Sequence, residues 1–502
     1  MGVMNLIRKK QPDENEAVFV KANEHFNSGR YKEALKLVLP FVETGTPWAL
    51  NILGLSYNGG LGLPKDQKTA FRLFTKAAEQ GLAISQNNLG NMYYNGEGTE
   101  QNYEKAFRWF EKSAKQGLAF SQYNLGYMYA LGNGVEKNEA LAKKWYKKAA
   151  KQGYAAAQFE YGLCLDNLKE SFVWIKKAAE QNLVAAQYIL GNFYKCGAGT
   201  IKDCAMAVAW YKKAAEQGHL TAQTDLAKMY EDGEGIPQDI DLALHWYEQA
   251  AEQGHISSQI KMGEICLERE EDELAAMWYR RAADKGEAYA MYMLGERSYT
   301  LYMLGELNED GYGMSNIEIA MQWYKKAANL GNELAQFALA LLYKDGIGCT
   351  QNYALAEQWY KKAAEQGYME AQHNLAIMYD VGKGIPQNKE LAFFWYLKAA
   401  EQGGRGAQFN VGNMYYHGTG TPKNQGLALT WFIKAAKQGD ATARYNVGHM
   451  IYYGRGTYKN QEKGLEWIKS AAKQGNEKAI KFLYNEANDR KRIAENARKD
   501  GR

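Results

Sequence analysis

A unit of about 36 residues repeats along most of this 502-residue chain and restricts what the chain can fold into. Eleven of the twelve tryptophans hold the same place in the unit, each followed by an aromatic or aliphatic residue and, eight residues on, by Gly or Asn. The units end at Gly81, Gly117, Gly153, Asn182, Gly218, Gly254, Gly286, Gly331, Gly367, Gly403, Gly439 and Gly475. Self-similarity at a fixed period is typical of solenoids, and it disfavours most enzyme folds.

Each unit contains two stretches with helical spacing. Residues 85–93 place Leu89, Met92 and Tyr93 on one face, and residues 106–114 do the same for a second set of apolar side chains. A Gly-x-Gly loop joins the stretches, and the final Gly favours the left-handed conformation that ends a helix. One hairpin cannot bury its own apolar face, so neighbouring hairpins must stack. We therefore expect an all-α stack without a single central core.

The repeat also resembles known families. Leu89-Gly90-x-x-Tyr93 followed by Ala106-x-x-x-Phe110 is similar to the tetratricopeptide pattern. The 36-residue period, the Gly-x-Gly loop and the Trp-Tyr-x-Lys-Ala-Ala-x-Gln-Gly ending resemble the Sel-one-like repeat (SLR) family more closely. That resemblance implies a right-handed α-α superhelix, a solenoid of tandem helix-hairpin repeats, that acts as an adaptor or interaction scaffold without catalysis.

The repeat boundaries predict three regions. These are a tetratricopeptide-like capping hairpin at 1–46, twelve repeats at 47–475 with irregular units at 154–182, 255–286 and 287–331, and a capping helix with a basic tail at 476–502. In the capping helix we expect Ala479, Phe482, Leu483 and Ala487 to cover the last repeat.

One irregular unit has a visible origin. Tyr292-Met-Leu-Gly-Glu296 recurs ten residues on as Tyr302-Met-Leu-Gly-Glu306. The insertion predicts either a lengthened first helix or a buckled segment. Two interpretations are open: a tolerated tandem duplication, or a hinge or specialised binding element between two halves.

Composition limits the partners. With 61 basic and 57 acidic side chains the net charge is +4, and the aromatics follow the repeat instead of a basic stripe. We therefore expect no nucleic-acid partner and no membrane insertion. Residues 1–10 lack the apolar core of a signal peptide, so we expect a cytoplasmic protein if Met1 is the native start. Many SLR relatives are exported, and a longer native chain would change this expectation.

The chemistry of metal sites and enzymes is missing from the sequence. The seven histidines share no metal spacing, and the Gly-x-Gly loops follow helices and lack a dinucleotide fingerprint. Cys196 and Cys204 flank one loop, where a cysteine-rich branch of the SLR family pairs cysteines, but we expect free thiols here. We predict no metal, no cofactor and no enzymatic activity.

The binding residues should lie on the first helix of each unit, which in tetratricopeptide stacks lines the concave groove. Asparagines recur just before the Leu or just after the Gly of the Leu-Gly pair, often beside an aromatic residue. An asparagine amide both donates and accepts, so it can hold a peptide group. The predicted groove residues are Asn88, Asn91, Tyr123, Asn124, Tyr188, Asn192, Phe337, Asn374, Phe409, Asn410, Asn413, Tyr445 and Asn446. The alternative is that these asparagines bond adjacent helices and these aromatics pack between units.

The sequence therefore predicts a cytoplasmic, bacterial scaffold that binds a protein or peptide in its groove. Two alternatives stay open at this point. One is an exported virulence or surface factor that binds a host protein. The other is a regulatory or immunity subunit that inhibits a toxin or an enzyme. The sequence identifies neither the partner nor the oligomeric state.

Overall fold

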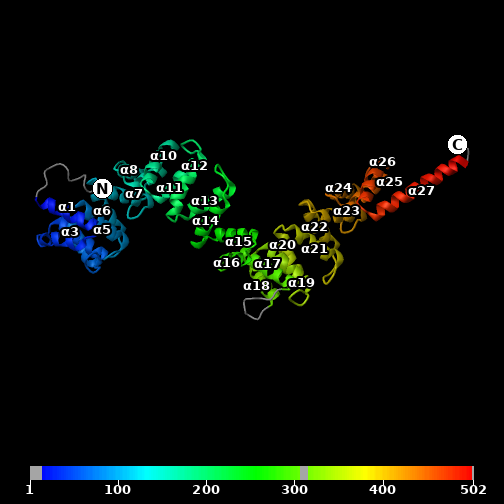
Figure 1. Ribbon diagram of the computed structural model, residues 1–502, viewed down its shortest axis with the longest axis horizontal. Coiled ribbons are helices and arrows are strands. Elements are labelled where there is room, and N and C mark those ends of the chain that lie inside the picture. Colours follow the sequence, from blue (N-terminus) through cyan, green and yellow to red (C-terminus); the bar gives the residue numbers. More distant parts are fainter. Residues whose placement is uncertain (1–13, 306–314, 500–502) are drawn as a thin grey trace. The chain divides into compact units, whose positions relative to one another are not determined.

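A computed structural model describes residues 14–305 and 315–499, and each regular element within these ranges is an α-helix (Figure 1). The described residues contain no strand, so the predicted all-α class of tandem helical hairpins is confirmed. The start of the predicted N-terminal cap, Glu306 at the end of the duplicated segment, and the last residues of the basic tail lie outside the described residues. Among the described helices, none is long and apolar enough to cross a membrane.

The chain divides into two compact units, Met1–His255 and Ile256–Arg502. The first unit contains α1 (Glu14–Asn27), α2 (Tyr31–Val42), α3 (Pro47–Gly59), α4 (Gln67–Glu79), α5 (Ala83–Asn95), α6 (Tyr103–Lys115), α7 (Ala119–Leu131), α8 (Glu139–Lys151), α9 (Ala155–Leu163), α10 (Leu168–Glu180), α11 (Val184–Cys196), α12 (Cys204–Glu216), α13 (Leu220–Asp232) and α14 (Ile240–Glu252).

The second unit contains α15 (Ile256–Glu268), α16 (Asp272–Ala283), α17 (Ala288–Leu304), α18 (Asn316–Asn329), α19 (Glu333–Asp345), α20 (Tyr353–Glu365), α21 (Met369–Val381), α22 (Lys389–Glu401), α23 (Arg405–His417), α24 (Gln425–Lys437), α25 (Ala441–Tyr453), α26 (Gln461–Lys473) and α27 (Glu477–Lys499). From α3 to α26 the odd-numbered helices are the first helices of their hairpins and the even-numbered ones are the second helices. Within each unit, each helix packs against its neighbours in the chain.

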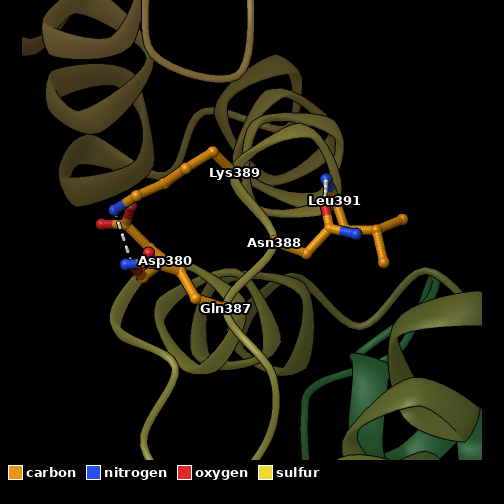
Figure 2. A network of polar contacts seen from close by, with 5 residues as sticks. All are labelled: Asp380, Gln387, Asn388, Lys389 and Leu391. Carbon is orange, nitrogen blue, oxygen red and sulfur yellow. Dashed lines mark hydrogen bonds and ion pairs between the residues drawn. The ribbon is translucent and has the colours of Figure 1, made fainter.

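Local signals fix where these helices begin and end. The loop between α21 and α22 is typical (Figure 2): Gly382 ends α21 in the left-handed conformation at φ 72°. Asn388 caps α22 by accepting a 2.9 Å bond from the backbone N–H of Leu391. The side chains of Gln387 and Lys389 donate to the terminal carbonyl of Asp380, at 2.8 and 2.6 Å. Side chains of the loop and of the first residue of α22 thus make hydrogen bonds to backbone groups at the end of α21 and the start of α22.

The Leu-Gly pair of the first helix reflects a close approach between the two helices of a hairpin. A Cβ placed on Gly412 of α23 would lie 2.7 Å from a ring atom of Phe432 on α24. Gly90 meets Phe110, and Gly295 meets Tyr324, at the same distance. Because real Cβ atoms essentially never come so close, glycine at this position lets the second-helix ring pack directly on the first-helix backbone.

The tryptophans that mark the repeat lie on the second helices, and eight of the eleven have a lysine or arginine from the next turn over the ring. Lys434 Nζ lies 3.8 Å from the ring centroid of Trp431, and Lys362 Nζ lies 4.0 Å from that of Trp359. The spacing of three residues puts each lysine over its ring. The tryptophan signature of the repeat therefore contributes to contacts of the second helices and does not belong to the first-helix face.

Buried residues form a series of clusters shared by consecutive hairpins. One cluster in the second unit runs from Ala340 of α19 through Tyr360, Leu375 and Tyr396 to Trp431 of α24. Smaller clusters join α24 to α25 and α26 to α27. This arrangement agrees with the expected stack, in which each hairpin buries its apolar face against its neighbours.

Two of the three irregular repeats differ from the others in the length of the first helix, whereas α15 of the repeat 255–286 has the regular 13 residues. Helix α9 has 9 residues where the regular first helices have 13. Helix α17 has 17 residues and ends at Gly305. Of the two outcomes expected for the duplication, the first helix is therefore lengthened, and the remainder of the insertion falls at 306–314, outside the described residues.

Helix α27 follows the last hairpin. Ala479 is buried, and Phe482 and Leu483 pack on the cluster of α26. The expectation for Ala487 was wrong, because its side chain is exposed. Ala487 stands 36 residues after Ile451, which is buried in a cluster with residues of α24 and packed by Trp467 of α26. Among the described residues no further helix follows α27 to cover Ala487 in the same way.

Candidate functional site

A cavity of about 330 Å³ opens between the first helices α23 and α25, and we call it the α23–α25 cavity. It is lined by Phe409, Asn413, Tyr416, His417, Phe432, Thr442, Tyr445, Asn446, His449, Met450 and Lys478. Four of these residues, Phe409, Asn413, Tyr445 and Asn446, were predicted from the sequence as groove residues. The structure brings these four together from two consecutive repeats.

Helical spacing explains why these side chains converge. Phe409 and Asn413 are four residues apart on α23, and Tyr445 and His449 are four residues apart on α25, so each pair lies on one face of its helix. Phe432 of α24 forms the floor, with its ring centroid 5.7 Å from that of Phe409. The site is thus built from one hairpin, the first helix of the next, and Lys478 of α27.

Two amides in the cavity are available to a ligand. Asn413 and Asn446 are half-buried, and neither side chain has a hydrogen-bond partner among residues 14–305 and 315–499. Each amide offers two donor hydrogens and an acceptor oxygen, which is the complement of a peptide group. The lining contains no carboxylate, and Lys478 is its one lysine.

Tyr445 and His449, beside these amides, stay neutral near pH 7. Burial lowers the pKa of His449, and the positive charge of Arg455 lowers it further. Burial raises the pKa of Tyr445, so its phenol keeps its proton. His449 lies 5.7 Å from Tyr445 and 6.2 Å from Phe482, measured between ring centroids. The cavity therefore offers apolar rings next to neutral donors and acceptors.

The predicted asparagines in the first repeats of the chain, Asn88, Asn91 and Asn124, are hydrogen-bonded to other asparagines of the protein. Asn88 Nδ2 donates to Asn51 Oδ1 at 3.0 Å, and Asn124 Nδ2 donates to Asn87 Oδ1 at 3.1 Å. Asn91 accepts a longer bond of 3.4 Å from Asn124. These amides connect consecutive first helices, which is the stacking role that the sequence left open.

The predicted residues in α7 and α11 pack within or between hairpins. Tyr123 lies 5.3 Å from Tyr154, and burial raises its pKa to about 12. Tyr188 Oη donates to Asp225 at 3.0 Å. Asn192 accepts a 2.5 Å bond from the hydroxyl of Tyr211. For these three, contact with a ligand stays a prediction.

The remaining predicted residues lie in the second unit. Phe337 packs on Tyr360 and Tyr368, with centroids 5.6 and 5.2 Å away. Asn374 donates at 2.8 Å to the carbonyl of Glu370, one turn earlier in its own helix. Asn410 has no partner among the described residues, but it does not line the α23–α25 cavity. The structure does not bring these three into that cavity.

Sequence reasoning missed His449 and Lys478 as lining residues. His449 follows Gly448 directly, at the position where Asn413 follows Gly412, so its position in the repeat could have identified it. Lys478 comes from α27, which was assigned only a capping role. Its part in the cavity depends on how α27 packs, and no repeat pattern encodes that packing.

Cysteines and metal-binding groups add no further site. All five cysteines, Cys196 and Cys204 among them, are free thiols. No group of three or more His, Cys, Asp or Glu side chains in the described ranges has the arrangement needed to hold a metal ion.

The repeat geometry has a counterpart among known proteins. The sequence matches the Sel1 repeat at residues 49–82, 83–118, 119–154, 155–183, 184–219, 220–255, 257–287, 288–332, 334–368, 370–404, 406–440 and 441–476. The chain belongs to the Sel1 repeat family. Sel1 repeat proteins mediate protein–protein interactions, and their scaffolds are as a class non-catalytic.

Three of the solved structures that match this chain show the range of similarity. A protective antigen present in uropathogenic Escherichia coli strains, with an SLR fold, is 32% identical over 87% of this chain and 86% of its own, with a TM-score of 0.58. A Sel1 repeat protein from Oxalobacter formigenes is 31% identical over 48% of this chain and 97% of its own, with a TM-score of 0.43. An immunity protein from Pseudomonas aeruginosa is 23% identical over 37% of this chain and 74% of its own, with a TM-score of 0.27. No curated protein matches this Sel1 repeat chain.

Proposed function

We propose that this Sel1 repeat protein is a non-enzymatic adaptor that binds a segment of a partner protein in the α23–α25 cavity. One observation carries the proposal: Asn413 and Asn446 place unpaired amides beside Phe409 and Tyr445 in one cavity. The buried core of a protein–protein interface is rich in aromatic side chains. The amides orient a peptide backbone, and the rings contribute apolar contact at low entropic cost.

The size of the cavity suits part of a partner chain. A volume of about 330 Å³ is at the lower end of the range of ligand pockets, large enough for one or two amino-acid side chains. A stable interface needs about 800 Å² on each partner, so the remaining contact area must come from neighbouring residues on the first-helix face. The cavity is then the site where a few residues supply most of the binding energy.

Affinity purification from the native host tests this proposal. The wild-type chain and the variant Asn413→Ala/Asn446→Ala are compared by mass spectrometry after circular dichroism has shown equal helix content. The matched control is Thr430→Ala/Lys437→Ala, because both side chains are exposed on the second helix α24 and neither lines the cavity. We expect a partner that is recovered with wild type and with the control, and lost with the cavity variant. Equal recovery with all three chains contradicts the proposal.

The relative from uropathogenic E. coli supports a second candidate function. That protein is called a protective antigen, and its sequence is similar to this chain over most of both lengths. On this candidate the chain acts outside the cell and its partner is a host protein. Immunoblotting of the culture medium and of cell fractions separates the two candidates: protein confined to the cytoplasm supports the adaptor and overturns the exported factor.

A regulatory or immunity role stays a prediction from the sequence. It requires that the partner be a toxin or an enzyme. Purified complex assayed for the partner's activity decides this point, since inhibition in the complex supports the role and full activity contradicts it.

A further inference from the structure

A second cavity of about 340 Å³ lies between the first helices α17 and α19, and we call it the α17–α19 cavity. Its aromatic lining consists of Tyr292, Tyr299, Tyr324, Phe337 and Tyr368. Two carboxylates, Glu296 and Asp345, line it as well, and the lining contains no lysine, arginine or histidine. In its charge and its number of rings this cavity differs from the α23–α25 cavity.

Glu296 is the central polar group of this site. Tyr324 Oη donates to Glu296 Oε1 at 2.7 Å, and the phenol of Tyr292 lies close enough to Glu296 for the carboxylate to raise its pKa. Burial, and then the negative charge of Glu296, raise the pKa of both tyrosines, so both hydroxyls keep their protons and remain donors. A carboxylate has about four lone-pair sites, and the bond from Tyr324 leaves acceptor capacity for a further donor.

No cation of the described chain neutralises Glu296. Asp345 pairs with Lys344 at 3.5 Å, whereas Glu296 has no lysine, arginine or histidine within ion-pair distance among residues 14–305 and 315–499. The nearby Arg297 pairs instead with Glu273. A half-buried carboxylate that has neutral donors but no counter-ion favours a positively charged ligand.

The rings around Glu296 also lack the cations that aromatic rings carry elsewhere in this protein. Lysines lie 3.8–4.3 Å from the centroids of Trp431, Trp359 and Trp323. In the described part of the chain no lysine or arginine lies over Tyr292 or Phe337. Aromatic faces next to a carboxylate attract an ammonium or guanidinium group.

We propose that the α17–α19 cavity binds the lysine or arginine side chain of a protein partner. Glu296 accepts hydrogen bonds from the charged head, the rings surround it, and Leu334, Leu341 and Ile347 contact the methylene groups of the stem. This inference rests on the proposed function, because it assumes that the first-helix face binds protein. It adds a second binding site for the partner and requires that the partner carry a lysine or arginine there.

The test measures binding of short probes to the full chain by saturation-transfer difference NMR. The probes are an acetylated, amidated alanine pentapeptide with a central lysine, its norleucine counterpart, and n-butylammonium. The variant Glu296→Gln keeps the shape and removes the charge. The matched control is Glu264→Gln, because Glu264 has the same position in its first helix, pairs with Lys261 and lines neither cavity.

We expect the lysine peptide to bind wild type and the Glu264→Gln control equally. Binding to Glu296→Gln should weaken about tenfold, since a charge-assisted bond is lost. The norleucine peptide should not compete. Equal binding of the two peptides, or an unchanged affinity for Glu296→Gln, overturns the inference. Binding of n-butylammonium without the lysine peptide also overturns it, because the cavity then takes a free amine.

The outcome is separable from that of the proposed function. If a captured partner depends on Asn413 and Asn446 but the probes do not bind, the adaptor function stands and the basic-residue site is wrong. If the probes bind but no partner depends on the α23–α25 cavity, the proposed function fails while the cation site remains.

Discussion

The side chain of Gln402 donates a 2.9 Å hydrogen bond to the side-chain oxygen of Gln372, which in turn donates to the carbonyl of Ala364 at 3.1 Å. Gln402 caps α22, Gln372 lies in α21, and Ala364 is in the last turn of α20. The same pair recurs as Gln438 with Gln408 and as Gln366 with Gln336. The glutamine of the Gln-Gly ending thus donates to the side-chain oxygen of a buried glutamine. The NH₂ group of that buried glutamine in turn donates to a C-terminal carbonyl of the preceding hairpin.

Replacing Gln372 by Met should destabilise the hairpins around it. The substitution removes two hydrogen bonds, the one from Gln372 to the carbonyl of Ala364 and the one from Gln402 to Gln372. The carbonyl keeps its bond from the Gly367 N–H, and the Gln402 amide keeps its bond to the Gly367 carbonyl. At about 0.5–1.5 kcal/mol per bond we expect a loss of about 1–3 kcal/mol. Hydrogen exchange of α20 to α22 measures the loss locally.

The double variant Gln372→Met/Gln402→Leu tests the coupling. The hairpin of α17 and α18 carries Met291 and Leu330 at the two equivalent positions, so an apolar pair is compatible with the fold. The double variant should therefore lose less than the sum of the two single variants. Additive losses would show that the two glutamines act independently.

Gly412→Ala should destabilise the second unit by about 1–3 kcal/mol, because the added Cβ would lie 2.7 Å from a ring atom of Phe432. Urea unfolding followed by circular dichroism measures the change. Gly426→Ala on α24 is the control, since the nearest atom to its Cβ is 3.5 Å away. The control should be neutral or more stable by about 0.5–1 kcal/mol, because alanine favours a helix over glycine. Equal effects of the two substitutions would contradict the close-approach account.

Acid should destabilise the protein in part through His373. Burial lowers the pKa of His373 below its ordinary value of about 6.5, so the unfolded chain takes up the proton more readily than the folded chain. The contribution of His373 to stability is therefore complete above about pH 6.5 and is lost as the pH falls through the lowered native pKa.

The variant His373→Phe tests this assignment. Phe337 and Phe409 occupy the equivalent position in the neighbouring first helices, so phenylalanine fits there. The free energy of unfolding, measured by urea titration between pH 7.5 and about 5, should fall less steeply for the variant than for wild type. Parallel pH curves would exclude His373 as a source of the acid sensitivity.

Phe409→Asn should close the α23–α25 cavity to a ligand. Asn446 stands 37 residues after Phe409, and Asn88 stands 37 residues after Asn51, which accepts its amide bond. The side-chain oxygen of an asparagine at position 409 would accept a hydrogen bond from the Asn446 amide, as Asn51 accepts one from Asn88. We expect the partner's affinity to fall about tenfold or more. Some stability is also lost, because Phe409 packs on Phe432, so affinity is compared after circular dichroism has shown that the variant is folded. Phe409→Leu is the control, because it also removes the ring but offers no acceptor to Asn446. If Phe409→Leu binds the partner as weakly as Phe409→Asn does, the loss of affinity comes from the ring alone.

The helices were predictable from the sequence because each repeat carries its own boundaries. Asn388 caps α22 and Gly382 ends α21 through contacts within a few residues, and such local signals are read directly from a pattern. The lengths of the irregular helices were not predictable in this way. The missing residues of the fourth repeat shorten α9 itself, because where a deletion is absorbed depends on packing against the neighbouring hairpins.

The candidate site was predictable only in part, since a residue's partner can lie a full repeat away. Asn88 and Asn446 have the same position in their helices, yet one is bonded to Asn51 and the other is unpaired beside Phe409. Comparing each asparagine with the residue 37 positions earlier would have separated the two cases. Glu296 was overlooked because the search followed asparagine instead of the position that it shares with Asn413.

Hydrogen exchange of the wild-type chain with and without its captured partner tests the central claim most directly. Binding in the α23–α25 cavity predicts the largest slowing of exchange in α23 and α25, and unchanged exchange in the repeats of the first unit. Protection confined to the second helices, or to α3–α14, would place the partner elsewhere and contradict the account.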